Sequence, residues 1–357
     1  MKSNYDILGN HIRLIDTRNR ESITDRVLGI NIDKFFMPSV ANVIGTDLSK
    51  YKLITKGKFA CNPMHVGRDE RLPVALYDEE KPAIVSPAYF MFEVIDNSIL
   101  KEDYLMMWFR RPEFDRICWL HTDGSVRGGI TWDDICRLEL PIPPIENQLE
   151  IVNSYKAITE RIALKQKIND NLDDTAQTLY QKYFESNSDK SSWKQGTVGD
   201  VLQLQRGHDL PRTEMTGGKY PVAGSTGTIG YHDEFTAEAP VIVMGRSGNI
   251  GNPRLYLCNC WTHNTSLYVK QIYEAEPLWV FYLLKNLNYD GFVGGSAVPT
   301  LNRNDVHAYG IAIPPLELQK SFSQKVMSLI YCKEENLSEI EKLQELQKII
   351  LTTMSSR

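Results

Sequence analysis

Residues 124–148 read GSVRGGITWDDICRLELPIPPIENQ, and residues 295–319 read GSAVPTLNRNDVHAYGIAIPPLELQ. The two stretches align without a gap at an offset of 295 − 124 = 171 residues, and eight of their 25 positions are identical. The identities are densest in the pattern I-P-P-x-E-x-Q, which ends at Gln148 in one copy and at Gln319 in the other. Because self-similarity at a fixed offset indicates repeated structural units, we interpret the chain as a duplication.

Each copy predicts a joint between a strand and a helix. Consecutive prolines cannot lie inside a helix, so the apolar strand before them must end, and the polar run after them starts a helix. Beyond each joint, apolar residues recur at spacings of three and four, as in a packed helical seam. The first seam consists of Tyr155, Ile158, Ile162, Lys165, Asn169, Leu172, Ala176, Leu179 and Tyr183. The second consists of Val326, Leu329, Lys333, Asn336, Ile340, Leu343, Gln347, Ile350 and Met354.

Both seams contain polar residues near the middle, Lys165 and Asn169 in the first and Lys333 and Asn336 in the second. Such residues weaken packing but can fix register and pairing; a seam interrupted by partly exposed surface is the other interpretation. At ~1.5 Å per residue, each helix is expected to be about 55–60 Å long. The duplicated layout favours an antiparallel, pseudo-twofold coiled coil of the two helices, with the globular parts at opposite ends.

The composition limits the class of protein. With 357 residues, of which 42% are hydrophobic and 24% charged, the chain is expected to form two or three compact units. A net charge of −5 argues against a protein that coats nucleic acid indiscriminately, but it allows a local basic face. The N-terminus lacks an apolar signal region and no run suits a membrane helix, so we expect a cytoplasmic protein that makes no membrane contact.

The six cysteines are scattered without paired spacing, and we expect free thiols. Cys258, Cys260 and His263 lie close together in the sequence, but no second ligand pair accompanies them. We therefore expect no metal site.

The globular parts are predicted to be α/β (α+β) domains with sheets and short helices. In the second part, we predict strands at VLQLQRG, PVIVMGRSG and SLYVK and a helix at PLWVFYLLKNL. The first part has similar elements, with its helix at DYLMMWFRRPEFDRI. The polar stretch at 185–196, ESNSDKSSWKQG, reads as a linker. The predicted domains are 1–144 and 188–315, with a long helix and linker at 145–187 and a second long helix at 316–357.

The duplicated joint and its long helices resemble the conserved regions of type I restriction-modification specificity subunits. Residues 140–148 and 311–319 match that family's apolar-Pro-apolar-Pro-Pro-x-x-x-Gln pattern, although Ala312 replaces the first proline. The segments KYPVAGSTGTIGY, VIVMGRSGNIG and THNTSLYV resemble second-domain features of the same family, and NPMHVGR with SPAYFMFEV resembles another subtype of its target-recognition domains. The resemblance covers nearly the whole chain.

The resemblance implies a non-catalytic subunit that binds a bipartite sequence in double-stranded DNA, with one recognition domain per half-site and the helices setting the gap. It implies partners as well: two modification (methyltransferase) subunits docked along the helices, and restriction subunits that act as translocase and nuclease. S-adenosylmethionine, ATP and Mg²⁺ are then bound by those partners, which methylate adenine and cut, and none is bound by this chain.

The sequence itself lacks the motifs of a catalyst. A methyltransferase needs an Asn/Asp-Pro-Pro-aromatic motif, and the segment NPMH at 62–65 lacks both the second proline and the aromatic residue. No GxxxxGK[ST] loop for ATP is present. We expect no catalytic residues.

Residues that contact DNA are expected in loops, where Arg, Asn and similar side chains reach bases and phosphates. In the first part the candidates are Asn62, His65, Arg68, Arg71, Ser86, Tyr89 and Arg127. In the second part they are Arg206, His208, Arg212, Ser225, Thr226, Arg246, Asn249, His263 and Asn264, of which Arg246 is the strongest. Helix pairing is assigned to the apolar seam residues Tyr155, Ile158, Ile162, Leu172, Leu179, Val326, Leu329, Ile340, Leu343 and Ile350.

Two alternatives stay open at this point. One is a recognition portion that acts alone, or a decoy, related to fused restriction enzymes. The other is a helical scaffold whose end domains bind proteins.

Overall fold

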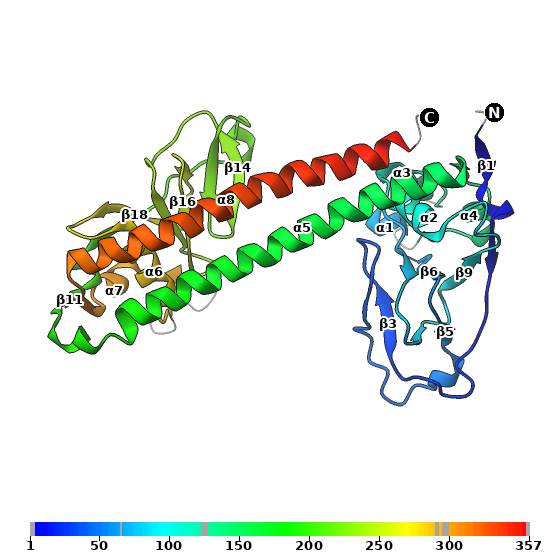
Figure 1. The fold of residues 1–357 in the computed structure, drawn as a ribbon, viewed down its shortest axis with the longest axis horizontal. Coiled ribbons are helices and arrows are strands. Elements are labelled where there is room, and N and C mark those ends of the chain that lie inside the picture. Colours follow the sequence, from blue (N-terminus) through cyan, green and yellow to red (C-terminus); the bar gives the residue numbers. More distant parts are fainter. Residues whose placement is uncertain (1–3, 65, 123–127, 290–292, 295–299, 355–357) are drawn as a thin grey trace. The chain divides into compact units, whose positions relative to one another are not determined.

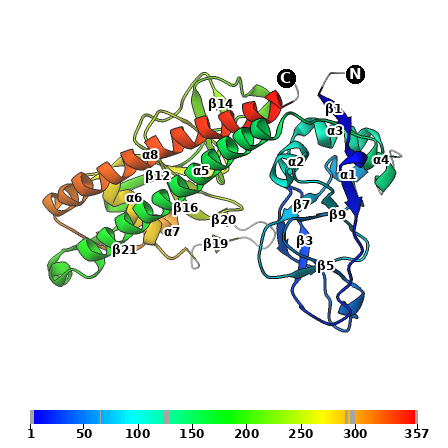
Figure 2. The ribbon, with the colours of Figure 1, turned by 45° about the vertical axis from the view of Figure 1, so that its right-hand side comes forward.

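The computed structural model describes residues 4–64, 66–122, 128–289, 293–294 and 300–354. The chain divides into two compact units (Figures 1 and 2). Unit 1 consists of Met1–Leu164 and Glu339–Arg357, and unit 2 consists of Lys165–Ser338. Each unit contains sheets and helices, as the predicted α/β class requires.

Unit 1 contains two four-stranded sheets. The first has the order β2 (Ile12–Leu14), β9 (Phe90–Val94), β6 (Lys58–Cys61) and β7 (Val74–Tyr77). The second has the order β4 (Phe36–Pro38), β3 (Val27–Ile30), β8 (Ala83–Val85) and β5 (Lys52–Ile54), with β3 and β8 parallel. A separate pair joins β1 (Tyr5–Ile7) to β10 (Glu139–Pro141). The short helices are α1 (Val66–Asp69), α2 (Glu102–Phe109), α3 (Pro112–Leu120) and α4 (Trp132–Cys136).

Two helices, α2 and α3, stand where the sequence predicts one. Pro112 has no N–H and clashes with the preceding turn of a continuous helix, so the chain breaks at Arg110 and Arg111 and Pro112 starts α3. Every residue of α2 from Tyr104 to Phe109 is buried in the core of unit 1. The aromatic residues of this segment therefore belong to the core.

Unit 2 repeats the same plan. Its main sheet has the order β12 (Leu202–Arg206), β18 (Ser266–Ile272), β15 (Val241–Gly245) and β16 (Gly251–Tyr256). The second sheet has the order β14 (Gly227–His232), β13 (Tyr220–Gly224) and β17 (Trp261–Thr262), with β13 and β17 parallel. Two further pairs join β11 (Lys194–Thr197) to β21 (Gly310–Ile313) and β19 (Val293–Gly294) to β20 (Thr300–Leu301). The short helices are α6 (Pro277–Asn286) and α7 (Arg303–His307).

The main sheets of the two units match strand for strand, although their sequences differ. The order β2-β9-β6-β7 corresponds to β12-β18-β15-β16, and the parallel pair β3 and β8 corresponds to β13 and β17. The start of α4 shows the duplication at the level of single residues: Thr131 caps α4, and Asn302, at 131 + 171 = 302, caps α7. The duplication found in 25 residues therefore extends over whole domains.

In the stretch at 185–196, expected as a linker, most residues are exposed, and Trp193 packs into the core of unit 2. The helix α5 (Ile145–Tyr180) continues into a π-helical turn at Gln181–Glu185, and the chain then enters β11. Phe184 and Trp193 are buried, with ring centroids 6.3 Å apart. Two aromatic residues therefore fix a stretch whose composition is otherwise that of a loop.

The long helices α5 and α8 (Leu316–Thr353) lie side by side and antiparallel within each unit (Figure 1). In unit 1, Arg161 Nε donates to Glu339 Oε1 at 2.8 Å, and Gln347 Nε2 donates to Thr159 Oγ1 at 2.7 Å. In unit 2, Lys333 Nζ donates to Asp173 Oδ1 at 2.8 Å. All the residues of the two expected seams are buried or half-buried, while most of the positions between them are exposed.

The polar residues of the seam bond to one another within unit 2. Asn336 Nδ2 donates to Asn169 Oδ1 at 2.9 Å, and Lys165 Nζ donates to Asn336 Oδ1 at 2.8 Å. Asn169 is 5% exposed and Asn336 8% exposed, so both amides are buried. Lys165 and Asn336 are equivalent positions of the duplication, since 165 + 171 = 336. A bonded polar layer favours the register-fixing interpretation of these residues over an exposed break in the seam.

The repeated glutamine of each joint ties a long helix to its own domain. Gln148 is fully buried; its Oε1 accepts from Lys101 N at 3.0 Å, and its Nε2 donates to Ile99 O at 2.8 Å and Pro143 O at 2.9 Å. Lys101 is the N-cap residue of α2. The joint of unit 1 is therefore closed by three hydrogen bonds from one side chain.

Gln319 ties α8 to its own domain in unit 2. Its Oε1 accepts from Glu276 N at 2.9 Å at the start of α6, and its Nε2 donates to Pro314 O at 2.8 Å. Gln319 is 1% exposed. Both copies thus contain glutamine because, in each, its side chain accepts from the N-cap residue of a short helix and donates to a proline carbonyl.

We expect Gln148→Ala and Gln319→Ala each to lower the free energy of unfolding by about 1–3 kcal/mol, because each leaves buried backbone groups without partners. The measurement is urea denaturation, with Gln166→Ala, an exposed position on α5, as the control. Equal denaturation midpoints for Gln148→Ala and Gln166→Ala would show that the joint does not depend on this side chain.

Candidate nucleic-acid interface

Five loops meet at one end of the main sheet of unit 2. His208 N, after β12, donates to Thr262 O at 2.7 Å, and His263 N donates to Ala223 O at 2.9 Å. Arg246 N, after β15, donates to Thr265 O at 3.0 Å, and Leu301 N donates to Arg246 O at 2.8 Å. The backbone therefore fixes the loops that carry most of the expected DNA contacts of this unit.

Side chains of the same loops are held by short polar contacts. Asn249 Nδ2 donates to Ser225 O at 3.3 Å, and His263 Nδ1 lies 2.9 Å from Thr265 Oγ1. Asn264 Nδ2 donates to Asp209 Oδ1. The structure thus brings together Arg206, His208, Ser225, Arg246, Asn249, His263 and Asn264.

Three arginines line a depression of about 490 Å³ beside these loops, namely Arg206, Arg246 and Arg303. Arg206 and Arg303 are exposed, and Arg246 is half-buried. Burial, and then the charge of Arg206, lower the pKa of Arg246 below its ordinary value. Arg303 is not among the candidates expected from the sequence; the signal for it is its position directly after the cap Asn302, at the start of a duplicated helix.

His307 connects α7 to the strand that carries Arg206. Its Nε2 accepts a hydrogen bond from Leu204 N, in β12, at 2.9 Å. An imidazole nitrogen accepts only when it is unprotonated. Burial, and then the charge of Arg303, lower the pKa of His307, and both effects favour the form that can accept.

Unit 1 places three of its candidates at the corresponding ends of its strands. Cys61 pairs with Phe90 in the register of unit 1 just as Gly245 pairs with Ser266 in unit 2. Asn62, after β6, therefore corresponds to Arg246, and Tyr89, before β9, corresponds to Thr265. Ser86 follows β8 as His263 follows β17. Asn62 and Ser86 accept from backbone N–H groups two residues ahead, which is typical of turns.

The other candidates lie elsewhere. In unit 1, Arg68 forms an ion pair with Asp69 at 2.6 Å and Arg71 with Asp33 at 2.9 Å. In unit 2, Arg212 is exposed in a short 3₁₀ turn and Thr226 is exposed in the turn between β13 and β14. His65 and Arg127 lie outside the described residues. All these assignments remain predictions.

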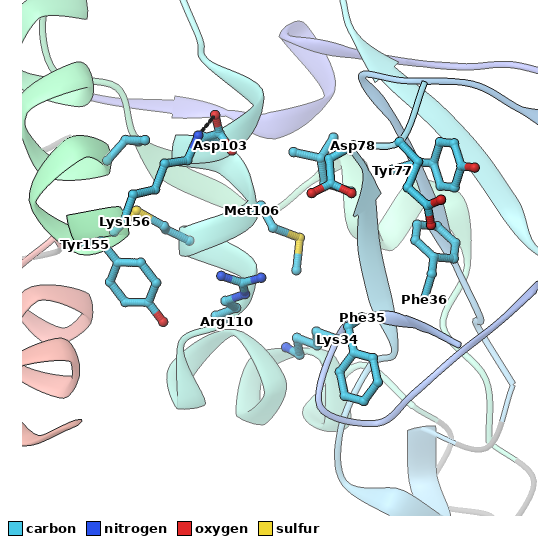
Figure 3. A pocket seen from close by; sticks show the side chains of 14 residues that line it. Lys34, Phe35, Phe36, Tyr77, Asp78, Asp103, Met106, Arg110, Tyr155 and Lys156 are labelled. Carbon is cyan, nitrogen blue, oxygen red and sulfur yellow. Dashed lines mark hydrogen bonds and ion pairs between the residues drawn. The ribbon is translucent and has the colours of Figure 1, made fainter. Parts of the chain in front are cut away.

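A cavity of about 250 Å³ in unit 1 lies between α2, α5 and the turn before β4 (Figure 3). Arg110 projects into it, and Lys156 Nζ donates to Asp103 Oδ2 at 2.6 Å on one side. Lys34 Nζ donates to Asp115 Oδ1 at 2.7 Å, while burial lowers the pKa of Lys34. Both lysines already have carboxylate partners, so we assign no ligand to this cavity.

Among the described residues, no group of three or more His, Cys, Asp or Glu side chains is placed to hold a metal ion. None of the six cysteines, all of which are described, forms a disulfide. In the part of the chain that the structure covers, no helix combines the length and apolar character needed to span a membrane.

Comparison with known proteins gives the same fold. A solved specificity (S) subunit of a type I restriction-modification system from M. genitalium superposes with a TM-score of 0.61 at 17% identity, covering 98% of this chain and 95% of that one. A second structure, described as the structural basis of complex assembly and conformational transition of the type I R-M system, gives a TM-score of 0.50 at 16% identity, covering 98% and 96%. The fold is therefore that of the specificity subunits.

The sequence comparisons point to the same family. Residues 190–349 match the family model described as the type I restriction modification DNA specificity domain. A curated relative, the putative type I restriction enzyme MjaX specificity subunit of Methanocaldococcus jannaschii, is 22% identical over 98% of this chain and 88% of its own length. Residues 190–349 therefore match the DNA specificity domain of type I restriction-modification systems, and nearly the whole chain is similar to their specificity subunits.

The His307 contact predicts a dependence of stability on pH. Because the pKa of His307 is below 6.5 in the folded chain, the unfolded chain binds this proton more readily. Its contribution to stability is complete above pH 6.5 and is lost as the pH falls towards the folded pKa. We expect His307→Gln, which keeps an acceptor, to lose less stability than the wild type between about pH 7.5 and about pH 5.5.

Urea denaturation midpoints at both pH values measure this effect. His121→Gln, at an exposed position in unit 1, is the control and is expected to behave as the wild type. An identical pH dependence in His307→Gln and the wild type would refute the assigned role of His307.

Proposed function

We propose that this chain is the subunit that gives a type I restriction-modification complex its DNA sequence specificity, with each unit reading one half of a bipartite target. The observation that carries the proposal is the repeated domain: the same strand order occurs twice, in a chain similar to specificity subunits, with different loop residues at corresponding places. Ser86 follows β8 where His263 follows β17. Different side chains at matching positions support two different half-sites.

The chemistry of the loops supports DNA as the ligand. Arginine and asparagine side chains form paired hydrogen bonds with base edges in the major groove, and backbone N–H groups and hydroxyls bind phosphates. Unit 2 brings Arg246, Asn249 and Asn264 into one set of loops together with Ser225. This combination suits base reading and phosphate binding within one surface.

We further propose that this chain supplies the DNA sequence specificity and that its partner subunits carry out methylation and cleavage. The sequence contains no motif for S-adenosylmethionine or ATP, so these cofactors and Mg²⁺ are assigned to the modification and restriction subunits. The duplicated helices offer two related surfaces, which supports two modification subunits, and the complex is assigned to the cytoplasm. A decoy built from the same domains is the competing proposal; similarity to specificity subunits weighs against an unrelated protein-binding scaffold.

The first test is single-molecule methylome sequencing of the host with and without this gene. We expect deletion to remove one adenine-methylated motif that has two parts separated by a gap of unspecified bases. Complementation with Arg246→Ala should reduce methylation of that motif, whereas Lys270→Gln, an exposed change at the other end of β18, should restore it. A methylome that is unchanged on deletion, with the partner subunits expressed, would favour the decoy.

A second prediction concerns the gap between the half-sites. One heptad is inserted into α5 between Leu164 and Lys165 and another into α8 between Ser338 and Glu339, where the helices pass between units. The helices grow by about 10 Å at ~1.5 Å per residue, or about three base pairs. We expect the methylated DNA motif to have a wider gap of unspecified bases and the same bases in both half-sites. Changed bases at an unchanged gap would contradict the proposed role of the helices.

A further inference from the structure

We propose that Arg206, Arg246 and Arg303 together bind a backbone phosphate of the DNA target and so set the register of unit 2 on the duplex. The inference rests on the proposed function, and it assigns a separate task to one part of the surface. Base reading is left to neighbouring loop residues, such as Asn249 and Asn264.

The three arginines come from separate parts of the chain but line the same depression, together with Leu267, Thr300, Leu301 and Asn302. Two of them are tied to their neighbours through hydrogen bonds. Arg206 Nε donates to Asn264 O at 3.4 Å, and the backbone of Arg246 bonds to Thr265 O and Leu301 N. The first contact orients the guanidinium group of Arg206, and the backbone contacts fix the position from which the Arg246 side chain extends.

The charges around this depression differ from those around several arginines of unit 1. Among the described residues, no carboxylate lies within ion-pair distance of Arg206, Arg246 or Arg303, whereas several arginines of unit 1 do form ion pairs. The nearby carboxylate of Asp209 is bonded to Asn264 Nδ2. Three cations around one depression repel each other, and an anion bound between them removes that repulsion.

The number of donors favours a phosphate over a base. A guanine edge presents two acceptors in the major groove, which one arginine fork satisfies. A phosphodiester has two charged oxygens, which attract several guanidinium groups, and arginine forks match phosphate geometry. Three convergent arginines exceed the capacity of one base edge, but they suit a phosphate of the strand that passes over the depression.

The corresponding place in unit 1 is built differently. Trp132 stands at the position equivalent to Arg303, since 303 − 171 = 132. Its ring packs on Phe90 and Phe92, with centroids 5.8 and 5.3 Å apart. Unit 1 thus has an aromatic residue in its core where unit 2 has a cation. The two units are therefore expected to differ in how much they add to the salt dependence of binding.

The test uses Arg303→Gln in the complex reconstituted with its modification subunits. Affinities are measured over a range of salt concentrations for a duplex that carries the target found by methylome sequencing and for an unrelated duplex. We expect the variant to bind both duplexes about tenfold more weakly at low salt and to show a shallower salt dependence, by up to about one unit in the log–log slope. Arg303→Lys, which keeps the charge but not the fork, should fall between the variant and the wild type.

Lys270→Gln is the matched control, since it removes one exposed positive charge from the same unit at the opposite end of β18. The methylated motif should stay the same in a host that carries Arg303→Gln. The inference is overturned if Arg303→Gln binds DNA as Lys270→Gln does, or if it relaxes the choice of bases while binding to the unrelated duplex is unchanged. It is also overturned if the wild type and Arg303→Gln bind DNA equally well and inorganic phosphate stabilises only the wild type against unfolding. A wild-type complex that binds neither duplex would instead refute the proposed function.

Discussion

The hydrogen bonds of two buried glutamines hold each long helix to its own domain, and the other contacts of the helices depend on this attachment. A proline pair ends a strand and a long helix begins, and nothing in that local rule fixes the direction in which the helix leaves the domain. Gln148 and Gln319 fix it, because each holds the first turn of its helix to the start of a helix in its own domain. Burial strengthens this constraint, since a buried amide without its partners is costly.

The sequence predicted the elements whose signals are local and periodic. The two joints follow from the proline pairs, and the long helices follow from seam positions that all turn out buried or half-buried. The α/β class followed from strand-like runs such as the one at β15, which is buried throughout. The repeat offset predicted where the second joint lies, but the internal order of the sheets could be known only from the structure, because strand pairing depends on contacts between distant residues.

What the sequence did not show depends on tertiary contacts. Pro112 divides one apolar run into two helices, and Trp193 packs an otherwise exposed, loop-like stretch against Phe184. At the candidate interface, Arg68 and Arg71 read as available cations until their carboxylate partners are seen. Arg303 was overlooked for the opposite reason: its neighbours in space, Arg206 and Arg246, are far away in the sequence.

The antiparallel helices have a consequence for how the protein is made. The core of unit 1 includes Val152 from α5 and Met354, which directly follows α8, and Ile350 and Leu351 of α8 pack against this core. A nascent chain normally folds its N-terminal domain while later residues are still being synthesised. Here the core of unit 1 is complete only when residues 350–354 have been synthesised. Unit 2, which lies between the two segments of unit 1 in the sequence, is therefore made before unit 1 can finish folding.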